Sequence, residues 1–464
     1  MAPLEAPRRF LMLSLIAIVA IAGQLFFSTV LPPMASLAGA NGLSASLGLS
    51  NGHGMTIAPS EGIAIKRVDP SYDVRGVYQP DEDRMPLIEP LPGLVLIYFL
   101  IGLTGLPLTL NLLMVVNCLV VAAGAVALAS ELMFRRFALG VVSGIAVAAF
   151  VPLYRLSMTV GYDVYEFLFV LGAVVCLLKF RRTSSHKWLL ANGLFLGMGL
   201  WIRSYFILYV IAQAIIIGIL LFRSGRAPTS TTKRVAGLRT MLVWAAPILL
   251  LALAMILVRD SGSTGTALTR GGFWHSFWMG VGQFENDEID GFTDWDVCEL
   301  ANELGYGVPC DPSYTDPGLP YLFQYRTDYN AVLGSRAREW IPNNVFRVVR
   351  NTAIRLSWIT VPGLMGSSKL EAHPAGRFLT VAVSLAIFLL TLFAVRLKGV
   401  VQATPGSRPN VGLTGEDTLI LVGTYIALIP LSPFYIIAKV VIVSYFCVLV
   451  TASSGALALW DRLR

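Results

Sequence analysis

The chain has 464 residues, of which 55% are hydrophobic and only 14% are charged, far below the roughly 25% charged residues of an average soluble domain. Its mean hydropathy is +0.69. This composition excludes an ordinary soluble protein and indicates an integral membrane protein, so the formal net charge of +7 reflects the placement of loops about a membrane rather than nucleic-acid binding.

The first apolar run covers residues 10–31 and directly follows Arg8 and Arg9. Ala38-Gly39-Ala40 resembles a signal-peptidase site, but the apolar core of a signal peptide is only roughly 7 to 15 residues long. Length therefore favours an uncleaved anchor helix, with the amino terminus on the cytoplasmic side.

Further apolar runs bring the predicted total to about ten spans, since a spanning helix requires roughly 20 apolar residues. They cover 108–131, 137–154, 161–179, 187–201, 204–222, 238–258, 377–396, 417–433 and 436–458. With the amino terminus inside, the arginine clusters "FRRF" and "KFRRTSSHK" fall on the cytoplasmic side, as the positive-inside rule requires. Both termini are then cytoplasmic.

The apolar segment 92–104 is not predicted to cross, because one more span would move the later basic clusters to the outside. We expect a surface helix there, ended by Gly105 and Pro107. The predicted fold is an all-α integral membrane protein, a multi-span helical bundle with interfacial helices on its outer face.

The predicted domains are a transmembrane core over 1–258 with a first outer segment at 32–107, a small extracytoplasmic domain over 259–376, and carboxy-terminal transmembrane helices over 377–464. The extracytoplasmic domain holds Cys298 and Cys310, and a disulfide between them suits an oxidising compartment. Its later part predicts an amphipathic helix along the membrane surface, with Val345, Val348, Val349 and Ile354 on one side and Arg347, Arg350 and Asn351 on another.

Charged residues gather in the first outer segment, in "DVRGVYQPDEDRMPLIEP" at 73–90. Carboxylates there suit a general base that activates a hydroxyl, and arginines suit a phosphate leaving group. The candidate catalytic acids are Asp73, Asp81, Glu82 and Asp83, and the candidate substrate-binding cations are Arg75 and Arg84. A solvated charge run is the alternative interpretation of each residue.

Other ionisable residues lie near membrane depth, where they are costly and therefore candidate site residues. Asp163 and Glu166 share one face at the start of the span 161–179, Glu166 as a catalytic candidate and Asp163 as a binding candidate. A simple helix cap explains them equally well. Arg203 and Lys439 are candidate phosphate ligands or interfacial anchors, and His275 is a candidate substrate ligand or a packed histidine.

Several stretches together resemble the multi-spanning GT-C glycosyltransferases, similar to the protein mannosyltransferase and aminoarabinose transferase group. The resemblance rests on "RMPLIEPLPGLVLIYFLIGLTG", "LSNGHGMT", "GYDVYEFLFVLGAVVCLLKFRR", "WIRSYFILYV" and "FWHSFWMGVGQFEN". It departs from that group in "PPMASLAGANGLSASLGLSNGHG", which holds no acid, and in "SPFYIIAK", where Lys439 replaces the usual arginine.

The resemblance implies an inverting transferase that moves a sugar from a polyprenyl-phosphate donor to a glycan, lipid or protein acceptor on the extracytoplasmic face of an inner membrane. A carboxylate of the first outer segment would be the base. No nucleotide or other cofactor is expected, no metal-ligand spacing is present, and the sequence leaves participation of a divalent cation open.

Two other functions stay open at this point. A carrier or flippase for lipid-linked glycans needs a binding site at mid-membrane and usually has internal repeats, whereas a transferase needs a site at the outer rim. A catalytically inactive relative that serves as a scaffold is the third possibility.

Overall fold

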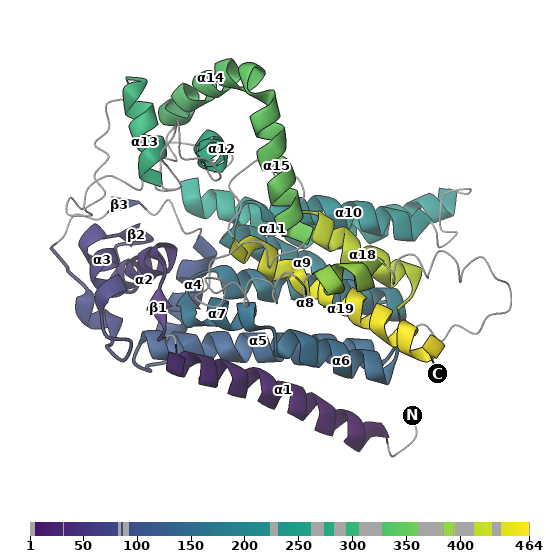
Figure 1. Cartoon of the computed structure of the whole chain (residues 1–464). Coiled ribbons are helices and arrows are strands. Elements are labelled where there is room, and N and C mark those ends of the chain that lie inside the picture. Colours follow the sequence, from purple (N-terminus) through teal and green to yellow (C-terminus); the bar gives the residue numbers. More distant parts are fainter. Residues whose placement is uncertain are drawn as a thin grey trace.

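The computed structural model describes residues 5–30, 32–81, 85–86, 92–222, 231–260, 273–282, 294–305, 327–360, 382, 385–392, 394, 413–428 and 438–463. These residues form an all-α membrane protein, in which long helices lie side by side and a smaller group of helices covers one flank (Figure 1).

The bundle helices coincide with the apolar runs of the sequence. They are α1 (Glu5–Val30), α5 (Leu110–Met133), α6 (Phe137–Ala148), α7 (Val151–Met158), α8 (Asp163–Thr183), α9 (His186–Ile202), α10 (Phe206–Leu221), α11 (Thr231–Asp260), α18 (Gly415–Ile426) and α19 (Ala438–Leu463). Residues 385–392 are helical too, while the rest of the predicted span 377–396 lies mostly outside the described residues.

By length and composition, three helices among the described residues are able to cross a membrane: Ala6–Val30, Leu110–Met133 and Gly237–Leu257. A fourth is added if the pair formed by Phe137–Ala148 and Pro152–Met158, bent by 50°, counts as one span. The bend follows from Pro152, which cannot continue a helix through its own amide. The count of about ten spans stays a prediction.

One end of the bundle collects the basic loops. The Arg8 guanidinium lies 4.7 Å from the centre of the Phe137 ring, and Arg136 Nη1 lies 2.7 Å from Asp461 Oδ2. These contacts bring the start of α1, the start of α6 and the end of α19 together, at the end where Figure 1 shows both termini. These three described segments, which the sequence assigns to the cytoplasmic side, thus share one end.

The opposite end carries the first outer segment, folded as α2 (Leu37–Ser50), α3 (Pro59–Arg67), the short η1 (Val74–Val77) and α4 (Pro92–Gly102). Two short ladders hold it. Strand β1 (Met34–Ala35) runs parallel to β4 (Thr159–Val160), with Met34 opposite Thr159. Strand β2 (Thr56–Ile57) runs antiparallel to β3 (Met85–Pro86).

The predicted surface helix is α4, and Gly105 ends the segment after it with a φ of 77°. One side of α4 is buried through Leu94, Val95 and Tyr98, whereas Leu100 on the other side is 61% exposed. An exposed apolar side is compatible with contact to lipid, and interfacial placement stays a prediction.

The second outer segment contains α12 (Phe273–Gly282), α13 (Asp294–Glu303), α14 (Thr327–Asn343) and α15 (Val345–Thr360). A separate apolar core joins them, built around Trp278, Val297, Tyr329 and Leu333. Cys298 in this core is disulfide-bonded, and its expected partner, Cys310, lies outside the described residues. The domain boundaries stay a prediction.

Candidate functional site

A buried ion pair lies where α8, α9 and α10 meet. Arg203 Nε donates to Glu166 Oε1 at 2.9 Å, and the Tyr205 hydroxyl donates to Glu166 Oε2 at 2.5 Å. Glu166 is 1% exposed, and a carboxylate that has lost its water is stable only when it is paired in this way. The sequence singled out Glu166 and Arg203 separately, and the fold brings them into direct contact.

The turn between α9 and α10 explains how Arg203 reaches Glu166. Arg203 is the C-cap of α9 and has an extended backbone conformation, and α10 begins at Phe206. Gly199 permits this tight turn, because a Cβ there would lie 2.0 Å from the Phe206 ring. The Arg203 guanidinium also lies 3.5 Å from the centre of the Tyr162 ring, whose electron-rich face attracts the cation.

Asp163 is the first residue of α8 and lies beside the first outer segment. It is 2% exposed. Just before it, the carbonyl oxygen of Val160 accepts from Ser36 Oγ at 3.1 Å, and Ser36 caps α2. A Cβ at Gly161 would lie 2.7 Å from Ser36 Oγ and 4.0 Å from Asp163 Oδ2. The start of α2 is therefore packed against the start of α8.

Helix α4 approaches the same place from another direction. A Cβ at Gly93 would lie 2.8 Å from the carbonyl oxygen of Trp201, so glycine allows α4 to touch the end of α9 close to Arg203. Tyr98 of α4 lies near Asp163 and Tyr165, and burial, then Tyr165 and Asp163, raise the pKa of Tyr98 well above its ordinary value. Tyr98 is therefore a neutral hydroxyl at any physiological pH.

Two tyrosine hydroxyls at this site are buried and have no hydrogen-bond partner among the described residues. Tyr98 and Tyr165 are 1% and 4% exposed, and their hydroxyl oxygens have no hydrogen-bond partner within the ranges that the structure describes. A buried polar group left unpaired costs about 1 to 3 kcal/mol. Such hydroxyls call for an explanation, and positions that receive water or a ligand supply one.

We name this site the tyrosine cluster. Its members are Tyr98, Asp163, Tyr165, Glu166, Arg203 and Tyr205. Sequence reasoning found its three charged residues and missed its three tyrosines, since Tyr98 and Tyr165 sit inside apolar runs that look like plain helix core. Tyr205 lies in the quoted stretch "WIRSYFILYV", where only Arg203 was singled out.

The acids of the first outer segment have separate positions. Asp73 caps η1 and accepts from Arg75 Nε at 3.0 Å, and this hydrogen bond is the main reason why the pKa of Asp73 is lowered. Asp81 is exposed and lines an open cavity of about 410 Å³ with Tyr78, Gln79 and Pro80. Glu82, Asp83 and Arg84 lie outside the described residues, so their predicted roles stay predictions.

A buried acid of the first outer segment escaped sequence analysis. Glu61 of α3 is 0% exposed. Its Oε2 accepts from Ser44 Oγ at 2.6 Å, and its Oε1 accepts from the Gln79 amide at 2.9 Å. These bonds join α2, α3 and the loop that leads to Asp81. Its spacing in "APSEGIAIKR" is that of an ordinary helix start, which gave no signal of burial.

The last two candidates lie elsewhere in the chain. His275 is 1% exposed and its Nδ1 lies 3.0 Å from the Tyr329 hydroxyl, inside the core of the second outer segment. This is the packed histidine that the sequence left as an alternative, and a role in substrate binding stays a prediction. Lys439 is in the first turn of α19, and its side chain is not described.

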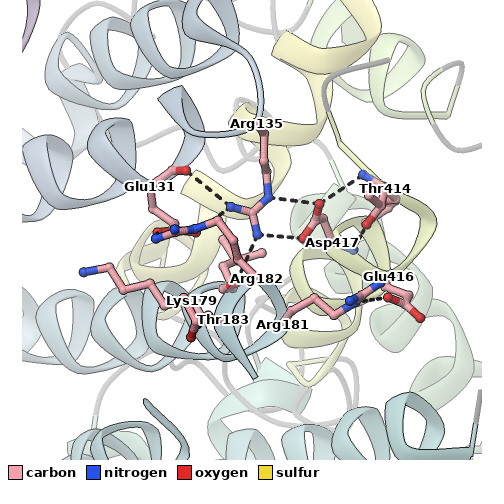
Figure 2. A network of polar contacts seen from close by, with 11 residues as sticks. Glu131, Arg135, Lys179, Arg181, Arg182, Thr183, Thr414, Glu416 and Asp417 are labelled. Carbon is pink, nitrogen blue, oxygen red and sulfur yellow. Dashed lines mark hydrogen bonds and ion pairs between the residues drawn. The ribbon is translucent and has the colours of Figure 1, made fainter. Parts of the chain in front are cut away.

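The opposite end of the bundle holds a second charge group, which we name the arginine network: the buried Glu131, Arg135 and Asp417 together with Arg182, whose side chain is 35% exposed (Figure 2). Arg135 donates to both oxygens of Asp417 at 3.0 and 2.9 Å and to Glu131 at 2.6 Å. Arg182 donates to both oxygens of Glu131 at 3.0 Å. The network joins α5, α8 and α18.

Within the described part of the chain, no group of three or more His, Cys, Asp or Glu side chains is arranged to hold a metal ion. The carboxylates of the tyrosine cluster number only two, Asp163 and Glu166, and Glu166 accepts from Arg203 and Tyr205.

No protein-family model matches the chain, and no curated protein matches it in sequence. Among solved structures, it is similar to an oligosaccharyltransferase of Archaeoglobus fulgidus, whose crystal structure was determined in complex with zinc and sulfate. The identity is 12% and the TM-score 0.44, and the match covers 97% of this chain but only 49% of the archaeal one. A likeness at this level assigns neither a family nor an activity.

Proposed function

We propose that this protein is a membrane glycosyltransferase of the GT-C type, which transfers a sugar from a polyprenyl-phosphate donor at the tyrosine cluster. One observation carries the proposal: at the bundle end that adjoins the first outer segment, two buried acids lie with the partly exposed Arg203 and with two buried hydroxyls that have no partner among the described residues. The sequence resemblance supports the donor class, and the inverting outcome is part of the same proposal.

Arg203 is the proposed ligand of the donor phosphate. Its planar guanidinium suits phosphate oxygens, and the hydrogen bond from its Nε to Glu166 fixes its orientation. Glu166 already accepts from Arg203 and Tyr205, so we assign it the positioning of Arg203. The hydroxyls of Tyr98 and Tyr165 would donate to oxygens of the bound donor, since they have no partner among the described residues.

Asp163 is the proposed general base. In the transfer step, the acceptor hydroxyl oxygen attacks the anomeric carbon while its proton passes to the Asp163 carboxylate. The bond between the anomeric carbon and the phosphate oxygen breaks, and the lipid phosphate leaves with the electron pair. Asp81 on the first outer segment is the second candidate, because its cavity lies on the segment that the resemblance assigns to the base.

The position of the cluster favours a transferase over a carrier. A carrier needs its binding site near the middle of the membrane. In the middle of the bundle, Asn192 Nδ2 donates to Gln213 Oε1 at 2.7 Å and Trp244 Nε1 donates to Asn192 Oδ1 at 2.7 Å, and this group contains no charged side chain, although Gln213 Nε2 has no partner among the described residues. The tyrosine cluster lies instead where α8 begins and α9 ends.

The test is an assay of purified protein with a panel of radiolabelled polyprenyl-phosphate sugars, in which donor binding and turnover are both measured. The proposal expects binding of at least one donor, with binding weakened by Arg203→Lys and turnover lost in Asp163→Asn. Binding without turnover on any acceptor would point to a scaffold, and absence of binding to every donor would contradict the proposal.

A further inference from the structure

Helix α15 turns an apolar stripe away from the protein. Phe346 is 82% exposed, Val349 58% and Val345 53%. Their spacing places them on one side of the helix. Large apolar side chains are normally exposed singly in soluble proteins, whereas a contiguous set marks an interaction surface.

The other side of α15 buries its polar groups. Asn351 and Arg355 are 2% and 1% exposed. Asn351 Nδ2 donates to the carbonyl oxygen of Val281 at 3.1 Å, and Arg355 donates to that of Gly280. A water-exposed helix has the reverse pattern, with its apolar side inward. The exposed side of α15 is therefore suited to an apolar medium.

The position of α15 indicates which medium this is. Val348 packs against the core of the second outer segment, and Leu356 packs against the core of the helix bundle. Figure 1 shows α15 descending from α14 to the long helices and running across their direction. A helix that joins an outer domain to spanning helices lies at the depth of the lipid headgroups.

The charge of α15 matches lipid phosphates. Its sequence, "VFRVVRNTAIRLSWIT", contains no acid, and of its arginines Arg355 is buried on the protein side whereas Arg350 is exposed. Arg350 is exposed and lies next to Val349. Basic side chains beside an apolar stripe are typical of helices that lie in a membrane interface, with the stripe among the acyl chains and the cations at the phosphates.

We propose that Val345, Phe346 and Val349 insert into the outer headgroup layer and hold the second outer segment at the membrane surface, with Arg350 at the lipid phosphates. The occupant is the phospholipid surface. The sequence placed Val348 with Val345 and Val349, but Val348 turns toward the protein and packs against the core of the second outer segment.

The test uses the full chain in lipid nanodiscs, with an environment-sensitive fluorophore on Phe346→Cys. Glu339→Cys in α14 is the matched control, because Glu339 is 72% exposed in its side chain and lies on the preceding helix. Val345→Cys is a second probe on the stripe in case the first variant misfolds. Wild-type protein treated with the same reagent gives the background from the native cysteines.

Lipids with a quencher in the upper acyl chain should remove most of the fluorescence at position 346 and at position 345, and leave position 339 unchanged. Equal quenching at all three positions, or none at positions 345 and 346, would overturn the proposal. Emission that depends on the number of protein copies per disc but not on the quencher lipid would assign the stripe to a second copy instead, and would also overturn it. None of these outcomes depends on glycosyltransferase activity.

Discussion

The two ends of the helix bundle use the same charged groups in different ways. The arginine network balances two arginines against two acids, and every carboxylate oxygen of Glu131 and Asp417 accepts at least one side-chain hydrogen bond from an arginine. The tyrosine cluster has two acids and one arginine, and two of its hydroxyls lack a partner in the described residues.

This difference separates a structural role from a binding role. A saturated buried network stabilises only the protein's own helices, since it has nothing left to offer a ligand. A buried site whose hydrogen-bond donors lack partners lowers the stability of the folded protein, and a bound molecule that accepts those hydrogen bonds restores it. The expectation is that substitutions in the arginine network lower stability, whereas substitutions in the tyrosine cluster lower binding and turnover.

The largest expected effect is on turnover in Asp163→Asn. Because removal of a general base costs about 10²-fold to 10⁴-fold in rate, kcat should fall by that factor while donor binding stays close to that of the wild type. Asp69→Asn is the control, since Asp69 is exposed and accepts from the Ser71 backbone amide at 2.8 Å. Equal activity of Asp163→Asn and the wild type would show that Asp163 is not the general base. Asp81 would then be the next candidate for that role.

Arg135→Gln should have the largest effect on stability. It leaves Glu131 and Asp417 buried with fewer partners, which costs about 3 to 5 kcal/mol. The midpoint of thermal unfolding in detergent should fall clearly. The matched control is Arg136→Gln, whose partner Asp461 has a side chain that is 44% exposed, because such surface pairs contribute about 0 to 1 kcal/mol. Similar falls in the unfolding midpoint of both variants would show that the arginine network stabilises the fold no more than a surface ion pair does.

Arg203→Lys should weaken binding of the lipid-linked sugar donor. Lysine lacks the two N–H groups that the guanidinium holds in a fixed geometry. Hydrogen bonds to charged groups contribute about 1.5 to 3 kcal/mol, which corresponds to roughly tenfold to a hundredfold in Kd. Glu166→Gln should weaken binding as well, through loss of the orientation of Arg203. Arg155→Lys in α7 is the control, because Arg155 is exposed. Unchanged Kd in both cluster variants would remove Arg203 from the donor site.

Tyr98→Phe distinguishes an unpaired hydroxyl from a paired one. The variant should keep or slightly raise stability, because the lost hydroxyl has no partner in the described residues, yet it should bind the donor more weakly. Tyr154→Phe is the matched control: its hydroxyl donates to the carbonyl oxygen of Ala148 at 2.6 Å, so its removal should cost about 1 kcal/mol. Destabilisation by Tyr98→Phe of the same size would indicate that the hydroxyl is paired inside the protein.

The smallest expected effect concerns the Asp73–Arg75 pair and pH. The hydrogen bond from Arg75 lowers the pKa of Asp73, so the pair stabilises the fold at pH values above the ordinary aspartate pKa and loses this contribution as the pH falls through the lowered pKa. Because the side chains of Arg75 and Asp73 are 44% and 33% exposed, the gain is below about 1 kcal/mol. Asp73→Asn should lower the unfolding midpoint slightly at pH 7 and not at strongly acidic pH, and the same difference at both would contradict this account.

How far the sequence predicts the fold is clear from particular residues. The apolar runs locate the bundle helices because bilayer thickness sets their length, and the arginine clusters predict that the basic loops share one end because basic loops stay on the cytoplasmic side. The sequence gave no sign that the acid Glu61 is buried, or that the hydroxyl of Tyr98 is buried without a partner among the described residues. Each lies in an ordinary helical context, and its burial depends on which helix packs against it, a property of tertiary contacts alone.

The candidate site was predictable only in part for the same reason. Glu166 and Arg203 are unusual at membrane depth and therefore stand out in a sequence. Their contact depends on the tight turn at Gly199, where only a glycine leaves room for Phe206. The orientation of α15 was partly misjudged because periodicity alone gave no sign that Asn351 and Arg355 bond to backbone carbonyls in another helix.

Photocrosslinking with a polyprenyl phosphate that carries a reactive group next to the phosphate tests the central claim most directly. Mass spectrometry of the crosslinked peptides should find the label on α4 near Tyr98, at the start of α8, or in the turn that holds Arg203, and Arg203→Lys should reduce it. Labelling concentrated around Asn192 and Gln213 in the middle of the bundle, or at the arginine network, would contradict a donor site at the tyrosine cluster.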